Sequence, residues 1–322
     1  MTSADVRVST LWEAMLRLSV EAGDRLEDAS AFEVHVAGAE ANVAFALARV
    51  GVPVRWTSRL PRNPLGQRVA ATLAAAGVDI STVRWVDDGR LGTYFVEFSP
   101  SPRPTQVIYD RARSAAATAT VEDYDWDLVL DATAFHVSGI TLGLSESSNA
   151  VARHALAEAK RRGLLVSYDV NYRRLLWSPA AAADALAGVA PLVDLLTCRV
   201  ADAELMFGIQ GEMHDLATQL REKLGIEHVV VTNGATGAAA VTGAGAFEQA
   251  AYSVQVVDRI GAGDAFAAGV LWGFLTESSL ESGLERGAAM AALKMTLRGD
   301  LYRLGVEEVD ALRAGETHEI NR

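Results

Sequence analysis

Short apolar runs alternate with helical patterns along most of this chain. The apolar runs lie at residues 128–130, 164–168, 195–197 and 229–232, and the helical patterns at residues 145–162, 180–188, 215–224 and 263–276. A buried parallel strand and the helix that follows it form one βαβ unit. The alternation therefore predicts a three-layer α/β/α sandwich with a mainly parallel central sheet.

A second, smaller sheet is predicted by three other segments. Residues 34–36, 93–98 and 106–111 alternate apolar with charged or aromatic side chains in turn-rich surroundings, as short half-buried strands do. No repeat or long linker interrupts the 322 residues, and 50% of them are hydrophobic, which is enough for one large core. We expect a single domain over residues 1–322.

The composition limits the kinds of partner. A net charge of −12 argues against a nucleic-acid or anionic membrane surface. Cys198 is the only cysteine, so no intrachain disulfide can form, and a reducing compartment suits the chain. No apolar stretch reaches the roughly eighteen residues that a membrane span needs. We expect a cytoplasmic protein that binds neither nucleic acid nor membranes.

Residues 258–264 read Asp-Arg-Ile-Gly-Ala-Gly-Asp and precede an apolar helical pattern. Residues 254–257, directly before them, are expected to form a strand. The small residues Gly261, Ala262 and Gly263 let a ligand approach the backbone, and free N–H groups at a helix start attract phosphate oxygens. Asp264 can then serve as the base for a hydroxyl beside the bound anion. Taken alone, the pattern fits an ordinary glycine turn with Asp264 as a helix cap about equally well.

Other known phosphate and metal motifs do not fit. A dinucleotide-binding G-x-G-x-x-G motif would need glycine at Phe266, and none of the lysines follows a glycine as a P-loop requires. The six histidines have no zinc-protease spacing and no cysteine partner. We expect no metal site built from protein side chains.

Two signatures together resemble the PfkB (ribokinase-like) family of sugar kinases. The family's C-terminal signature is similar to residues 258–264, and its N-terminal signature, a glycine turn before an Ala/Asn-containing helix, is similar to residues 36–51. Further similar stretches lie at residues 92–111, 138–140, 169–173, 232–237 and 298–300, so the resemblance covers nearly the whole chain. It implies a ribokinase-like fold in which residues 12–36 and 91–113 form a β-sheet lid over the sugar.

Within the family, the Asp-x-Asn-x-Arg run that ends at Arg173 looks most like 2-keto-3-deoxygluconate kinases, and so does the pair Tyr109 and Arg111. In those kinases the sugar acid is surrounded by residues matching Gly38, Ala39, Asn42, Tyr94, Tyr109, Arg111, Ile140, Arg173 and Asp300. A hydrogen bond from guanidinium to a substrate carboxylate contributes about 1.5–3 kcal/mol, which favours an acid over a neutral sugar. The alternative is that Arg111 and Arg173 pair with neighbouring acids such as Asp110 and Asp169.

The resemblance also implies ATP as the phosphoryl donor. ATP would be held by Asn171 and by a turn composed of Thr232, Asn233, Gly234, Ala235, Thr236 and Gly237. On its own this turn is more typical of a hairpin, and the family usually has lysine where Thr232 stands. Mg²⁺ is expected on the nucleotide phosphates and water rather than in a protein cage.

The function implied by the resemblance is ATP-dependent phosphorylation of 2-keto-3-deoxygluconate at its terminal hydroxyl, with Asp264 as base. One alternative is a kinase of the same family for 2-keto-3-deoxygalactonate, fructose or ribose. Another is a non-catalytic sugar-acid binding protein on this scaffold, because Trp12, Ala37 and Arg199 replace residues that the family usually has near its ligands. Exposed lid strands often pair between subunits, which favours a homo-oligomer.

Overall fold

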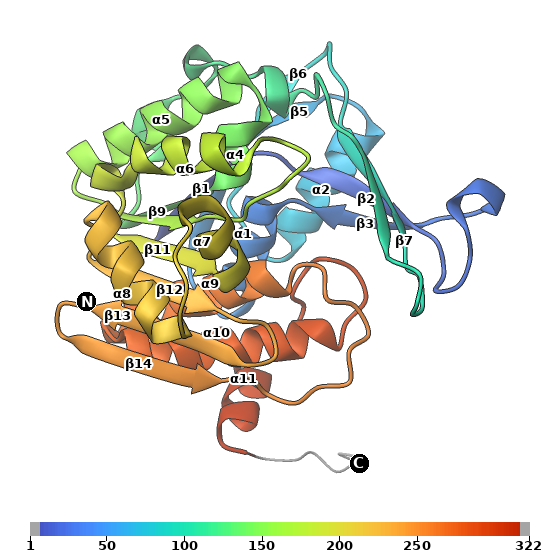
Figure 1. Cartoon of the computed structure of the whole chain (residues 1–322). Coiled ribbons are helices and arrows are strands. Elements are labelled where there is room, and N and C mark those ends of the chain that lie inside the picture. Colours follow the sequence, from blue (N-terminus) through green and yellow to red (C-terminus); the bar gives the residue numbers. More distant parts are fainter. Residues whose placement is uncertain (1–6, 316–322) are drawn as a thin grey trace.

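The computed structural model describes residues 7–315, and its main feature is a large sheet with helices on both faces (Figure 1). Its strands are β1 (Val8–Leu11), β4 (Val54–Thr57), β9 (Ala134–Ser138), β10 (Leu165–Asp169), β11 (Leu195–Arg199), β12 (His228–Thr232), β13 (Gly237–Thr242) and β14 (Gly245–Ala250). They lie in the order β14-β13-β12-β11-β10-β9-β1-β4. The strands from β12 to β4 pair in parallel, and β13 and β14 add an antiparallel hairpin. The expected mainly parallel architecture is confirmed.

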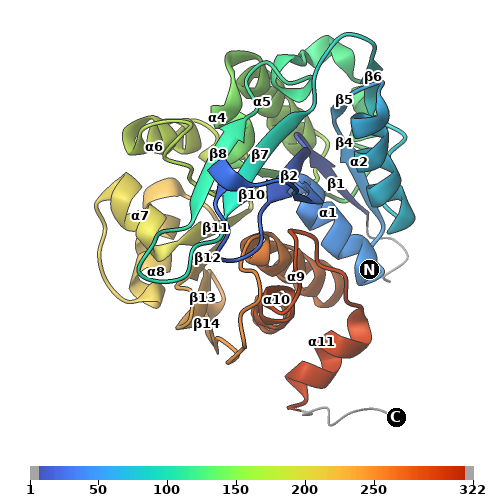
Figure 2. The same cartoon turned by 90° about the vertical axis from the view of Figure 1, so that its right-hand side faces the viewer.

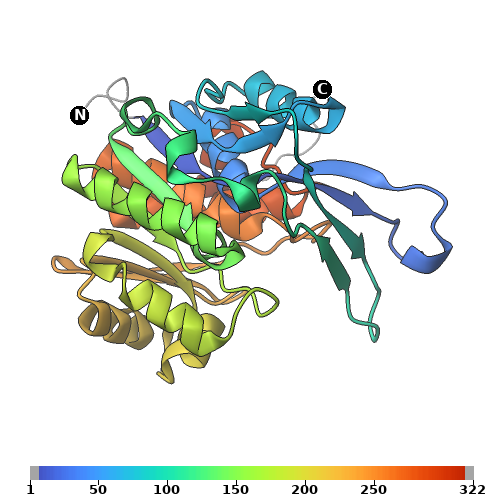
Figure 3. The same ribbon diagram turned by 90° about the horizontal axis from the view of Figure 1, so that it is seen from above.

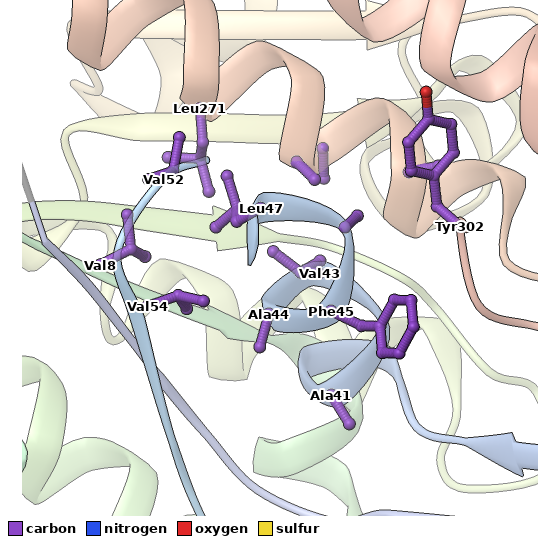
Figure 4. Close-up of a cluster of buried hydrophobic side chains, with 14 of the residues drawn as sticks. Val8, Ala41, Val43, Ala44, Phe45, Leu47, Val52, Val54, Leu271 and Tyr302 are labelled. Carbon is purple, nitrogen blue, oxygen red and sulfur yellow. The ribbon is translucent and has the colours of Figure 1, made fainter. Parts of the chain in front are cut away.

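Two hydrophobic cores occupy the two faces of this sheet. The first lies under α1 (Ala39–Arg49), α2 (Pro64–Ala75), α9 (Ala262–Glu277), α10 (Leu280–Met295) and α11 (Val306–Arg313), and the second under α3 (Trp126–Val129), α4 (Gly139–Leu144), α5 (Glu146–Arg161), α6 (Pro179–Ala187), α7 (Val200–Phe207) and α8 (Met213–Leu224). Because side chains alternate along a strand, Val230 of β12 joins the first core whereas Val229 and Val231 join the second. Figure 4 shows part of the first core, where side chains of the sheet, α1 and α9 meet. The four helical patterns expected from the sequence correspond to α5, α6, α8 and α9.

A smaller sheet projects from one side of the sandwich (Figures 1 and 3) and faces the viewer in Figure 2. Its strands are β2 (Met15–Ser19), β3 (Glu33–Ala37), β7 (Gly92–Glu97) and β8 (Gln106–Asp110), in the order β3-β2-β7-β8. We call it the small sheet. It contains all three short strands that the sequence predicts. A separate parallel pair joins β5 (Arg59–Pro61) to β6 (Arg84–Val86), and short 3-10 turns lie at Leu26–Asp28, Ala116–Thr118, Val121–Asp123 and Ala190–Leu192.

Two expected strands are wrong. Residues 128–130 lie at the end of α3, because the Asp125 carboxylate accepts hydrogen bonds from the N–H groups of Asp127 at 3.1 Å and Leu128 at 3.3 Å and so starts a helix. Residues 254–257 form no strand. The N–H of Val257 donates to the carbonyl of Met295 at 2.8 Å, so the end of α10 holds this segment in place of a strand.

The helices are short compared with a membrane span. The longest of them, such as α5, α9 and α10, have 16 residues. Within residues 7–315, no helix is long and apolar enough to cross a membrane.

Candidate active site

Asp264 lies in the first turn of α9, buried against the first turn of α1. Its carboxylate Oδ2 accepts a hydrogen bond of 2.7 Å from Nδ2 of Asn42. The neighbouring Glu40 accepts hydrogen bonds from the Ser138 N–H at 2.9 Å and the Ser138 hydroxyl at 2.7 Å, at the end of β9. These contacts place the two helix starts at the carboxyl edge of the parallel sheet, where open α/β sheets bind ligands.

The surroundings of Asp264 favour its neutral form more than water does. The pKa of Asp264 is raised from 3.8 to about 6, chiefly by burial, and the charges of Asp300 and Glu40 contribute in the same direction. The hydrogen bond from Asn42 and the charge of Arg173 act in the opposite direction. A carboxylate with a pKa close to neutral pH can take a proton from a hydroxyl group during a reaction.

The turn before Asp264 depends on close backbone packing. Gly261 has φ of 85°, and a Cβ there would lie 2.1 Å from the Asp300 carbonyl oxygen. At Gly263 a Cβ would meet nothing within 4 Å, so the first turn of α9 is open on that side. The N–H of Ala262 already donates a hydrogen bond to the carbonyl of Arg259 at 3.2 Å, so it is not fully available to a ligand. The helix start itself still favours an anion.

Gly261→Ala should therefore destabilise the fold. A left-handed backbone costs a non-glycine residue about 1–2 kcal/mol, and the added methyl group also displaces the loop at Asp300. We expect a lower unfolding midpoint in a denaturant titration, whereas Gly263→Ala, the matched control, should leave the midpoint nearly unchanged. Equal midpoints for the two variants would contradict this account of the turn.

Aromatic and acidic side chains meet beside this turn, at the base of the small sheet. Tyr94 and Tyr109 are stacked on β7 and β8, with ring centroids 5.5 Å apart. The Tyr94 hydroxyl donates to Oδ2 of Asp300, and Arg17 donates to Oδ1 of Asp300 at 2.8 Å. Burial raises the pKa of Asp300, and burial together with the Asp300 charge raises the pKa of Tyr94. The structure therefore brings three of the predicted sugar-binding residues together.

Arg111 does not pair with Asp110, which is bound by Arg90. Arg111 forms a buried ion pair with Glu13. Burial raises the pKa of Glu13, although the charge of Arg111 acts to lower it. The Arg111 guanidinium also lies 5.6 Å from the centre of the Tyr109 ring. Its buried Nε–H has no hydrogen-bond partner in the part of the chain that the structure describes. This donor is buried as well as unpaired, and the charge of Arg111 is largely balanced by Glu13.

Arg173 differs from Arg111 in both exposure and pairing. It is exposed in the loop after β10, and no carboxylate within residues 7–315 lies at ion-pair distance from it. It is nevertheless close enough to lower the pKa values of Asp264 and Asp169. The alternative in which Arg173 pairs with Asp169 is wrong for this structure, because the two side chains form no ion pair there; the Asp169 carboxylate accepts from the Asn171 N–H at 3.2 Å.

The remaining predicted residues lie along the same sheet edge. Ile140 follows β9 and is half-buried in α4, and Asn171 follows β10 with φ of 38°. Arg199 ends β11 and pairs in register with Thr232 of β12. The Arg199 guanidinium binds both oxygens of Asp202 at 2.7 Å, so the positive charge at this position is matched by a buried acid.

The predicted nucleotide segment is a tight hairpin between β12 and β13. The N–H of Asn233 donates to the carbonyl of Gly237 at 2.8 Å, and the N–H of Thr236 donates to the carbonyl of Asn233 at 2.9 Å. Residues 233–236 are exposed. The turn is thus a hairpin, as its sequence indicates, and it lies beside the end of β11.

Sequence reasoning considered Asp169 only as an ion-pair partner of Arg173 and assigned no role to Glu40 or Arg17. Burial, followed by the charges of Asp264 and Asp202, raises the pKa of Asp169 to about 7, which makes it a second candidate base. The position of Asp169 at the end of an apolar strand could have indicated a functional role. No sequence pattern indicates a role for Glu40 or Arg17, because their partners are distant in the sequence.

A buried acid of raised pKa thus lies at a helix start on the carboxyl edge of this sandwich, where it could accept the proton of a hydroxyl group. The sequence profile described as "pfkB family carbohydrate kinase" matches residues 7–303. The chain therefore belongs to the pfkB family of carbohydrate kinases.

The most informative relatives share nearly the full length. A 2-dehydro-3-deoxygalactonokinase of Haloferax volcanii is 42% identical over 97% of this chain and 98% of its own. The crystal structure of 2-dehydro-3-deoxygluconokinase from Thermotoga maritima has a TM-score of 0.90 at 35% identity, covering 96% of this chain and 98% of that one. An uncharacterised sugar kinase from Pyrococcus horikoshii, solved with ATP, has a TM-score of 0.81 at 24% identity over 96% of this chain and 99% of that one, which shows a common fold.

Proposed function

We propose that this carbohydrate kinase transfers the γ-phosphoryl group of ATP to the terminal hydroxyl of a 2-keto-3-deoxy sugar acid, with 2-keto-3-deoxygluconate as the leading substrate. The observation that supports this most is the combination of buried Asp264, whose pKa is about 6, with a nearby exposed arginine, Arg173, that has no carboxylate partner among residues 7–315. A base and an anion-binding cation are thus available at one sheet edge.

In the proposed reaction, Asp264 takes the proton of the terminal hydroxyl as its oxygen attacks the γ-phosphorus. The bond from the γ-phosphorus to the bridging oxygen breaks, and ADP leaves with that oxygen. The start of α9, with Gly261 and Gly263, stabilises the charge that develops on the transferred group. Asn42 holds the Asp264 carboxylate in one orientation through their 2.7 Å hydrogen bond. The small sheet would act as a lid that excludes water.

The residues at this edge fit a magnesium nucleotide. Asp169 is a half-buried acid whose pKa is raised to about 7 by desolvation and by the charges of Asp264 and Asp202. A divalent cation nearby would relieve this repulsion, and Mg²⁺ is usually held by phosphates, water and one or two carboxylates. When bound, Mg²⁺ would offset the charge of the phosphates. Asn171 and the 232–237 hairpin are the proposed contacts to ATP.

The galacto epimer is a second candidate, because the Haloferax volcanii relative, named a 2-dehydro-3-deoxygalactonokinase, is 42% identical to this chain. The two sugar acids differ at one hydroxyl. Both carry the carboxylate that Arg173 and, less directly, Arg111 would bind. A neutral sugar would leave these donors without an anion.

The proposal is tested by measuring Mg²⁺-dependent ADP release with 2-keto-3-deoxygluconate, its galacto epimer, fructose and ribose at equal concentrations. We expect a kcat/KM at least about tenfold higher for one or both sugar acids than for either neutral sugar, from the arginine contacts. Faster turnover of fructose or ribose would overturn the choice of a sugar acid. ATP binding without turnover of any sugar would favour the non-catalytic alternative.

The pH dependence should report Asp264. Its pKa is raised to about 6, and the base must be deprotonated, so kcat/KM should be lost as the pH falls through 6 and reach a plateau above pH 7. The substrate carboxylate, with an ordinary pKa of roughly 3.5, stays ionised in this range. Arg173→Gln should move the midpoint upward, because Arg173 lowers the pKa of Asp264. A flat profile from pH 5 to 8 would argue against Asp264 as the base.

A further inference from the structure

A buried cluster of charges joins the small sheet to the loops that carry Asp264 and Asp300. Arg17 of β2 donates from Nη1 to Oδ1 of Asp300 at 2.8 Å and from Nη2 to Oδ2 of Asp258 at 2.6 Å. The side chains of Arg17 and both acids are at most 3% exposed. Arg17 is therefore shared by two acids from different loops, and its side chain is held at both ends of the guanidinium.

Asp258 connects this arginine to the backbone around Gly261. Its Oδ1 accepts from the N–H of Ile260 at 3.0 Å, directly before Gly261, and its Oδ2 accepts from the N–H of Gly299 at 3.1 Å. The ammonium group of Lys294, itself fully buried, donates to the carbonyl oxygens of Asp258 at 3.1 Å and Leu297 at 3.3 Å. Residues 258–261 and 297–300 are thus tied to each other and to β2.

Asp300 is oriented from two sides. Arg17 binds its Oδ1 and the Tyr94 hydroxyl binds its Oδ2, so the carboxylate cannot rotate without breaking a contact. Two cations, Arg17 and Lys294, balance the two acids. Removing Arg17 would leave two buried carboxylates to share Lys294, and a buried unpaired charge is strongly unfavourable. The acids would then be expected to take up a proton or turn away.

We propose that Arg17 is a positioning residue, which fixes the Asp300 carboxylate for a sugar hydroxyl and sets the Gly261 turn relative to the small sheet. Arg17 touches neither reacting atom and acts through Asp300 and Asp258. The role in sugar binding rests on the proposed kinase function, whereas the role in loop position does not.

The chain contains a matched control for this role. Arg298 donates to Oε1 of Glu33 in β3 at 2.7 Å and therefore links the same loop to the same sheet. Its side chain is 66% exposed and that of Glu33 is 39% exposed, so the pair is solvated. Exposed pairs of this kind contribute little to structure. Arg298→Gln removes a cation between the same two parts of the molecule without leaving a buried charge.

The first test compares steady-state kinetics of Arg17→Met, Arg17→Lys and Arg298→Gln. We expect kcat/KM for the sugar acid to fall by about 30-fold or more in Arg17→Met, because a buried charge loses its partner, while KM for ATP changes less than about threefold. Arg17→Lys should be intermediate, since one ammonium cannot reproduce the forked contact. Arg298→Gln should stay within about twofold of the wild type. Equal effects of Arg17→Met and Arg298→Gln, or a rise in KM for ATP alone, would overturn the proposal.

The second test is independent of turnover. Hydrogen exchange followed by mass spectrometry reports protection of the Ile260 and Gly299 amides, which donate to Asp258. In the ligand-free full chain, the amides of these segments should exchange faster in Arg17→Met than in the wild type. Their exchange rates should be unchanged in Arg298→Gln. If the wild type phosphorylates no sugar, the proposed function fails and exchange alone decides the positioning role. Unchanged exchange in a folded Arg17→Met or Arg17→Lys protein would refute that role.

Discussion

Asp264→Asn is expected to lower kcat for the sugar acid by on the order of 10³-fold, the typical contribution of a general base. The side chain keeps nearly the same shape, and its oxygen can still accept the hydrogen bond from Asn42, but an amide cannot take a proton. KM values for ATP and sugar should change by less than about threefold, because the contacts to both ligands stay. The measurement is ADP release under saturating Mg²⁺-ATP, compared with wild type.

The control for this prediction is Asp169→Asn. Asp169 is half-buried, its pKa is raised to about 7, and it is the competing candidate for the base. Asp169 does not lie in the first turn of α9, so we expect its substitution to lower kcat about tenfold or less through phosphate and magnesium placement. A larger loss in Asp169→Asn than in Asp264→Asn would transfer the role of base to Asp169.

A measurement of unfolding stability distinguishes a variant that has lost the base from one that has lost the fold. The pKa of Asp264 is about 6 in the folded protein and 3.8 ordinarily, so its ionised form destabilises the fold increasingly as the pH rises from 4 and fully above pH 6. At about 1.4 kcal/mol per pH unit, this difference corresponds to about 3 kcal/mol. Asp264→Asn removes this unfavourable free energy, so the variant should be more stable than wild type at pH 7.5. The difference in unfolding free energy between the two proteins should shrink toward pH 4. Denaturant titrations at both pH values measure it.

Arg173→Leu is expected to raise KM for the sugar acid roughly 10–100-fold. A hydrogen bond from a guanidinium to a carboxylate contributes about 1.5–3 kcal/mol, and each 1.4 kcal/mol corresponds to about tenfold in affinity. KM for ATP should stay within about threefold, since the loss concerns the sugar carboxylate. The measurement is a titration of sugar acid at fixed Mg²⁺-ATP.

Arg174→Leu is the matched control, because Arg174 is the exposed neighbour of Arg173 in the same loop. It should leave KM for the sugar acid within about twofold. The slow turnover of fructose, a substrate without a carboxylate, should be the same in Arg173→Leu and wild type. Equal loss on the acid and on fructose would mean that Arg173 acts on the phosphate or on the fold instead.

The fold could be predicted from the sequence to a large extent, because its signals are local. The alternation of strand and helix patterns predicted α5, α6, α8 and α9 and the strands β10, β11 and β12. The 258–264 and 36–51 segments each combine a turn with a helix start, and the structure places their key residues, Asn42 and Asp264, in contact at 2.7 Å.

What could not be predicted depends on partners far apart in the chain. Arg17 and Asp258 are 241 positions apart, and no periodicity connects them. The pairing of Arg111 with Glu13 was missed for the same reason, since only the acid next to Arg111 in sequence could be considered. Residues 254–257 have the composition of a strand, but tertiary contact with the end of α10 determines their path.

The most direct test of the central claim is to identify the product by ³¹P and ¹³C NMR after incubating the wild-type protein with Mg²⁺-ATP and 2-keto-3-deoxygluconate or its galacto epimer. We predict one phosphomonoester, with phosphorus coupled to the terminal carbon of the sugar acid, formed in equal amount with ADP and formed about 10³-fold more slowly by Asp264→Asn. Inorganic phosphate with unmodified sugar acid, or an Asp264→Asn protein that forms the same ester at the wild-type rate, would contradict the account.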